Sequence, residues 1–125
     1  MKKKILVVDD DKIMLKMLDK SLSGNGFSLA QAANGKDAVF IAKTWQPDLI
    51  VLDIMMPEMD GCEAAEILKR DPNTKDIPII FLTSLLSKAE EDKSSGCPGR
   101  TYLAKPFDEP KLLEEIRRQM EGSQA

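Results

Sequence analysis

Short runs of apolar residues alternate along the chain with longer segments in which apolar residues recur every three or four positions. The runs Ile5–Val8, Leu49–Leu52 and Ile79–Leu82 each contain four apolar residues and end at a polar side chain. Short apolar runs that end at polar or turn-forming residues are typical of strands buried on both faces, as in parallel sheets. The three runs therefore predict three interior strands.

Two weaker runs predict further strands. Phe27–Ala32 ends before an Asn-Gly pair, and Tyr102–Ala104 ends before Lys105-Pro106, and both pairs favour a turn. Between the strands the apolar positions have helical spacing. The predicted helices are marked by the apolar positions within Ile13–Leu22, Ala38–Ala42, Ala64–Leu68 and Leu112–Met120.

The segment before the last predicted strand departs from this pattern. Ala89 is the only apolar residue within Lys88–Ser95, whereas a surface helix normally carries about three or four apolar residues per two turns. We predict a short, frayed or displaced fourth helix here. Residues 121–125 are predicted to form a short frayed tail.

Strands that alternate with helices imply a parallel sheet with right-handed crossovers and helices on both faces. We predict an α/β fold, a doubly wound five-stranded parallel sheet of the (βα)5 type, with the flavodoxin-like strand order 2-1-3-4-5 rather than a Rossmann order. The 125 residues show no linker and no internal repeat. Residues 1–125 are therefore expected to form one domain with a core at about 3–120, without a further output domain.

Composition narrows the classes of function. The net charge of −3 at pH 7 gives no basic surface for nucleic acid or for an anionic membrane. The apolar runs are too short to span a bilayer, and no apolar signal segment follows Lys2–Lys4, so a cytoplasmic location is expected. The absence of histidine excludes histidine-based triads and histidine-ligated zinc. Cys62 and Cys97 lack metal-ligand spacing, and both are expected to remain thiols.

The predicted strands end in residues that carry chemistry. In an open α/β sheet the carboxyl ends of the strands share one edge, where ligands bind. That edge is expected to bring together Asp9, Asp10, Asp53, Thr83 and Lys105. Two carboxylates about 5 Å apart repel each other by roughly 3 kcal/mol at an effective dielectric constant near 20. Three carboxylates therefore favour a bound cation, and oxygen-only ligands suit Mg²⁺ with retained waters.

A metal beside a carboxylate suggests phosphoryl transfer. Asp53 can act as a nucleophile toward phosphorus and form an aspartyl phosphate, because this reaction depends mainly on positioning and charge neutralisation. Mg²⁺ would bridge Asp53 and one phosphoryl oxygen, while Lys105 and the Thr83 hydroxyl would bind the other two. A preformed nucleotide phosphate is disfavoured, because acids rather than a glycine-rich loop follow the first strand.

These motifs resemble the receiver domain of bacterial two-component response regulators, over about residues 3–120. The resemblance rests on the segments Val7–Asp10, Leu52–Gly61, Leu82–Ser84 and Tyr102–Phe107. It implies that Asp53 accepts a phosphoryl group from a histidine kinase or a histidine phosphotransfer protein. It also implies that the protein acts on a downstream protein target, which is unknown. The resemblance further implies that the protein is not an enzyme and assists only its own phosphorylation and dephosphorylation.

The resemblance assigns further roles residue by residue. Asp10 and Asp53 would ligate Mg²⁺ directly, together with the Met55 carbonyl, and Asp9 would help through water. Thr83 and Lys105 would bind the phosphoryl group, and Tyr102 would turn inward as Thr83 moves. The remaining implied positions are structural: Pro57 and Gly61 shape the loop after the third strand, and the Lys105–Pro106 bond is cis.

Two other functions compete with the switch. A pseudo-receiver would be a constitutive protein-binding module with a vestigial pocket, and the complete set of site residues argues against it. A phosphatase of the haloacid dehalogenase type would need a second Asp two residues after the nucleophile, where this chain has Met55. Met55 and Leu85 also offer no polar group to orient water, so slow hydrolysis of the acyl phosphate is expected.

Overall fold

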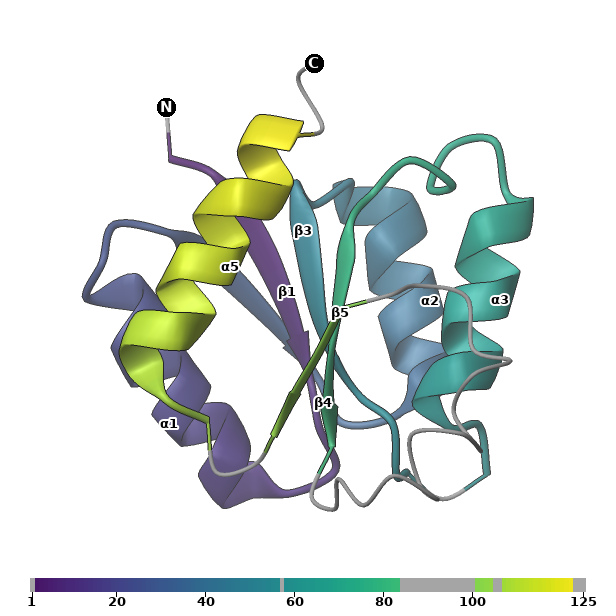
Figure 1. Cartoon of the computed structure of the whole chain (residues 1–125). Coiled ribbons are helices and arrows are strands. Elements are labelled where there is room, and N and C mark those ends of the chain that lie inside the picture. Colours follow the sequence, from purple (N-terminus) through teal and green to yellow (C-terminus); the bar gives the residue numbers. More distant parts are fainter. Residues whose placement is uncertain (1, 57, 84–100, 105–106, 123–125) are drawn as a thin grey trace.

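Five parallel strands form one sheet in the computed structural model, which describes residues 2–56, 58–83, 101–104 and 107–122 (Figure 1). Of residues 83, 101, 102 and 104 it describes the backbone alone. The strands are β1 Lys4–Val8, β2 Ser28–Ala32, β3 Leu49–Asp53, β4 Ile79–Thr83 and β5 Thr101–Ala104. Their order is β2-β1-β3-β4-β5, and every neighbouring pair is parallel. The predicted strand order is confirmed.

Four helices cover the two faces of the sheet within the described residues. They are α1 Lys12–Ser23, α2 Gly35–Trp45, α3 Gly61–Arg70 and α5 Glu109–Gly122. Figure 1 shows α1 and α5 on one face and α2 and α3 on the other. The predicted doubly wound α/β arrangement is therefore confirmed. The predicted fourth helix at Lys88–Ser95 lies outside the described residues, as do residues 123–125 of the predicted tail. The predicted start of the tail at residue 121 is wrong, because Glu121 and Gly122 are the last two residues of α5.

The apolar runs form the centre of the core because their side chains alternate between the two faces of the sheet. Leu6 and Ile50 pack with the cluster under α2 and α3, whereas Ile5 and Leu49 pack with the cluster under α1 and α5. These four side chains are fully buried. Each such burial contributes about 1.5–3 kcal/mol, which favours apolar residues at the interior positions of β1 and β3.

Side-chain caps begin three of the helices. Asp11, Asn34 and Asp60 each accept a hydrogen bond from a backbone N–H of the following turn, which satisfies a donor that has no partner inside the helix. Because Asn34 is the cap, α2 begins at Gly35, three residues before Ala38, the first apolar position that marks this helix in the sequence. No helix in the described residues is both long and apolar enough to cross a membrane.

Candidate functional site

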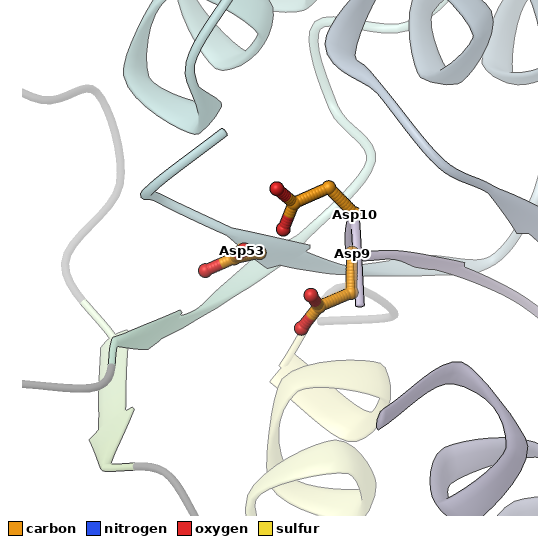
Figure 2. Close-up of side chains that lie close together, drawn as sticks. All are labelled: Asp9, Asp10 and Asp53. Carbon is orange, nitrogen blue, oxygen red and sulfur yellow. The ribbon is translucent and has the colours of Figure 1, made fainter. Parts of the chain in front are cut away.

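Three aspartates lie together at the edge of the sheet where the strands end. Asp9 and Asp10 directly follow β1, and Asp53 is the last residue of the neighbouring strand β3. Figure 2 shows the three side chains at the ends of these two strands. One carboxylate oxygen of each lies within 4.8 Å of an oxygen of the other two. The predicted convergence of these three residues is what the fold produces.

The strand register explains why the three side chains meet. Val8 pairs with Leu52 in the ladder between β1 and β3. Asp9 and Asp53 therefore occupy the next position on adjacent strands, which lie about 4.8 Å apart. The backbone N–H of Asp9 donates to the Ala32 carbonyl at 3.1 Å, so the main chain is held there by the next strand as well.

Two of the three carboxylates are buried and oriented by backbone groups. Asp9 is 0% exposed and Asp53 is 1% exposed, whereas Asp10 is exposed. The Asp11 N–H donates to Asp9 Oδ1 at 2.9 Å, and the Met55 N–H donates to Asp53 Oδ1 at 3.3 Å. The site thus has two fixed inner carboxylates and a third at its mouth.

The electrostatics of the cluster favour a cation. At 4.8 Å and an effective dielectric constant near 20, two unit negative charges repel each other by about 3 kcal/mol. The oxygen-only donor set, buried on one side and open on the other, fits a hard divalent ion that keeps several waters. Mg²⁺ has these preferences, so Asp9, Asp10 and Asp53 together are suited to hold it.

The loop between β3 and α3 is packed tightly against the site. The Gly61 N–H donates to the Ile54 carbonyl at 3.0 Å. A side-chain Cβ at Gly61 would overlap the carbonyl oxygen of Asp53, so only glycine lets α3 begin this close to the end of β3. The Met55 side chain points to solvent, 66% exposed.

The other predicted site residues are described only in part. β4 ends at Thr83, which follows the residue that pairs with Asp53, so its backbone lies at the same edge of the sheet. Tyr102 lies in β5 and pairs with Phe81. The side chains of Thr83 and Tyr102 lie outside the described part of the chain, as do Lys105 and all of Pro57 and Pro106.

An exposed apolar surface beside the site was not predicted. In the sequence, Ile13 and Met17 fall at helical spacing with Leu18, a pattern that would place them on the buried face of α1. Instead Ile13 is 70% and Met17 45% exposed, and the buried positions of α1 are Met14, Leu15, Leu18 and Leu22. The periodicity identified the helix, but its phase was wrong because four apolar residues fall among the first six of α1 and only some of them face the sheet.

The expectation of a thiol at position 62 is also wrong. Cys62, the second residue of α3, is disulfide-bonded. A disulfide between distant segments depends on their approach in the folded chain, and the spacing of cysteines along the sequence does not reveal it. Cys97 lies outside the described residues.

The fold and the acidic site match a known family. A model of the response regulator receiver domain matches residues 5–117. The chain belongs to this family. Receiver domains serve two-component signalling as switches rather than as classical enzymes, and the family binds Mg²⁺ in its acidic pocket. The resemblance seen in the sequence motifs is confirmed.

Relatives and solved structures agree with this assignment. The polar-differentiation response regulator DivK of Brucella anthropi is 31% identical over 119 residues, which cover 94% of this receiver domain chain and 95% of DivK. The transcriptional regulator RpaA of Synechocystis is 35% identical over 114 residues, which cover 91% of this chain and 47% of RpaA.

Two solved structures share the fold over almost their whole length. The chemotaxis protein CheY4 of Vibrio cholerae has a TM-score of 0.86 at 29% identity, covering 94% of this chain and 98% of CheY4. The receiver domain of the sensor histidine kinase PA1611 of Pseudomonas aeruginosa has a TM-score of 0.89 at 27% identity, covering 96% of this chain and 98% of that domain. The PA1611 domain has a magnesium ion coordinated in its active site cleft.

Proposed function

We propose that this receiver domain is a phosphorylation-dependent switch in which Asp53 accepts the phosphoryl group. The observation that carries the proposal is the cluster of three carboxylates within 4.8 Å at the end of β1 and β3. Asp53 is the member that is both buried and on the central strand β3. A reacting carboxylate in that position is shielded from bulk water and oriented by a backbone N–H.

Asp10 and Asp53, together with the Met55 carbonyl, would hold Mg²⁺, with Asp9 acting through a water. When bound, the metal neutralises charge on the carboxylates and on the phosphoryl oxygens. Asp53 Oδ attacks phosphorus as the bond from phosphorus to the donor nitrogen breaks, and the donor histidine leaves with the electron pair. Thr83 and Lys105 would bind phosphoryl oxygens, and the movement of Thr83 would draw Tyr102 inward and alter the surface offered to a downstream target.

The exposed apolar residues support a protein as the phosphoryl donor. Ile13 and Met17 lie in the first half of α1, which follows Asp9 and Asp10 in the chain, and Met55 lies two residues after Asp53; all three side chains are at least 45% exposed. A shallow groove of about 510 Å³ continues this surface between Met17 and Phe107. Apolar patches beside an active site mark protein contacts. A histidine kinase or phosphotransfer protein docked there would present its phosphohistidine to Asp53.

The proposal also includes the extent of the domain, its location in the cell and the lifetime of its acyl phosphate. Residues 1–125 are proposed to act as one receiver domain in the cytoplasm, where its kinase would phosphorylate it. The Met55 side chain faces solvent at the mouth of the site and has no group that positions a water. The acyl phosphate of Asp53 is therefore proposed to be long-lived.

The test is intact-mass spectrometry after incubation with acetyl phosphate and Mg²⁺. Wild type should gain the mass of one phosphoryl group, and Asp53→Asn should gain none. Asp11→Asn is the matched control, because Asp11 is an exposed helix cap outside the cluster and asparagine caps a helix as well as aspartate does. Equal labelling of wild type and Asp53→Asn would refute the role of Asp53. A wild type that takes up no phosphoryl group would favour the pseudo-receiver.

A further inference from the structure

Gly35, the first residue of α2, is buried against a loop of the site that belongs to a different βα unit. A Cβ at Gly35 would lie 2.7 Å from the carbonyl oxygen of Met59 and 2.9 Å from its Cγ. Among the described glycines only Gly26 has a positive φ, so the backbone conformation does not require glycine at position 35. Space requires it.

Met59 lies in the loop that joins Asp53 to α3. Its side chain is half-buried and packs against the core cluster beneath α2 and α3. The preceding residue, Glu58, has a φ of 67°, a left-handed conformation that costs a non-glycine residue about 1–2 kcal/mol. A loop with such a conformation keeps one shape only when its surroundings hold it.

The loop is therefore held at two points. Gly61 fixes its end, because the Gly61 N–H bonds to the Ile54 carbonyl and its missing side chain lets the Asp53 main chain approach. Gly35 supports the same loop from outside, through the main chain of Met59. Figure 1 shows that α2 and α3, which begin at Gly35 and Gly61, both start at the edge of the sheet where β3 ends.

We propose that Gly35 is a positioning residue for the metal-binding loop. By leaving room for Met59 it fixes the part of the loop that leads into α3 and so helps to hold the Met55 main chain beside Asp53. This inference rests on the proposed function only in naming Mg²⁺ as the ligand that the loop serves. The contact itself involves only residues of the chain.

The distances decide the size of the effect. Ordinary van der Waals contact of a Cβ begins at 3.4 Å, so an alanine at position 35 must move the Met59 carbonyl or the start of α2 by about 0.7 Å (3.4 minus 2.7). Groups that bind a metal must be held within about 0.5 Å of their productive position. The shift required at Met59 is larger than this tolerance, so even a part of it carried along the loop to the Met55 main chain should weaken Mg²⁺ binding, although Gly35 itself contacts no metal-binding group.

The experiment compares Gly35→Ala with Gly24→Ala. Gly24 caps the far end of α1 with a φ of −65°, and a Cβ there would lie 3.1 Å from the Lys20 carbonyl, so that variant changes packing away from the site. The Mg²⁺ dissociation constant is measured by calorimetry, and amide chemical shifts are recorded without metal. Mutation of a residue that orients the ligands of a metal, without binding the metal itself, typically lowers the metal affinity about 10–100-fold.

Gly35→Ala is expected to raise the Mg²⁺ dissociation constant about tenfold and to shift the metal-free amide signals of Met55 and Gly61. Gly24→Ala should lower Tm, but it should change neither the Mg²⁺ dissociation constant nor the amide signals of Met55 and Gly61. Wild-type affinity and unshifted amides in Gly35→Ala would overturn the inference and leave Gly35 a packing residue. If wild type itself binds no Mg²⁺, the proposed function fails, and the metal-free amide signals alone decide the role of Gly35.

Met59→Ala provides a second variant should Gly35→Ala fold poorly. It removes the side-chain atom nearest Gly35, Cγ, and leaves the helix start unchanged. The loop should loosen, which raises the Mg²⁺ dissociation constant several-fold with faster amide exchange at Gly61. Unchanged exchange and affinity would contradict the positioning role.

Discussion

Removal of one buried negative charge from the acidic cluster should stabilise the metal-free protein. In Asp9→Asn the amide keeps the shape of the carboxylate, and its oxygen still accepts from the Asp11 N–H as Asp9 Oδ1 does at 2.9 Å. The substitution removes the repulsion between Asp9 and Asp53, whose oxygens lie within 4.8 Å. Both groups are almost fully buried, so bulk water screens this pair little.

At that distance and an effective dielectric constant near 20, the repulsion is about 3 kcal/mol. We expect Asp9→Asn to raise the free energy of unfolding by roughly 1–3 kcal/mol, or Tm by roughly 4–12 °C. Saturating Mg²⁺ should stabilise wild type by about 2.7 kcal/mol at a hundredfold excess over its dissociation constant, and the variant by less. The difference in Tm between Asp9→Asn and wild type should therefore shrink or change sign when Mg²⁺ is added.

The assay is thermal unfolding by circular dichroism, with and without Mg²⁺, at constant ionic strength. Trp45 fluorescence serves as a second probe of unfolding but not of metal binding, because Trp45 lies beside Lys4 at the start of β1, away from Asp9. Asp11→Asn is the control. A lower Tm for metal-free Asp9→Asn than for wild type would refute the reasoning, because the negative charge of Asp9 would then stabilise the fold by more than its repulsion with Asp53 costs.

Three further predictions follow from the surface and loop around the site. Ile13→Asp should slow phosphoryl transfer from a histidine phosphotransfer donor about tenfold, equivalent to about 1.4 kcal/mol, yet leave labelling by acetyl phosphate unchanged; equal slowing of both would place Ile13 outside the docking surface. Met55→Asn should shorten the lifetime of the acyl phosphate several-fold in a decay assay, since an amide can orient the attacking water, and an unchanged or longer lifetime would count against that role. Glu58→Gly should raise the free energy of unfolding by roughly 0.5–1 kcal/mol, because glycine adopts the left-handed conformation without strain; a destabilised variant in urea unfolding would show that the Glu58 side chain contributes more than its backbone costs.

The sequence predicted the sheet well because strands that are buried on both faces need apolar residues at every interior position. The runs Ile5–Val8 and Leu49–Leu52 are apolar at every position. This pattern is typical of strands that are covered on both faces. Once the strands are parallel, their carboxyl ends must share an edge, so the meeting of Asp9 and Asp53 followed from topology without any knowledge of side-chain geometry.

Features that depend on approach between distant segments were not predictable in this way. The exposure of Ile13 depends on which side of α1 faces the sheet, and this cannot be read from the spacing where four of the first six residues are apolar. The disulfide at Cys62 and the contact of Gly35 with Met59 depend on tertiary packing. An Asn-Gly pair indicates a turn, and it gives no sign that the glycine faces a loop of another βα unit.

The most direct test of the central claim is to locate the phosphoryl group on the chain. After phosphorylation with acetyl phosphate and Mg²⁺, borohydride reduction converts an acyl phosphate into the corresponding alcohol, and peptide mass spectrometry identifies the residue. We predict reduction at Asp53 alone, dependent on Mg²⁺ and abolished by prior chelation. Reduction at Asp9 or Asp10, or labelling that is independent of Mg²⁺, would contradict the account.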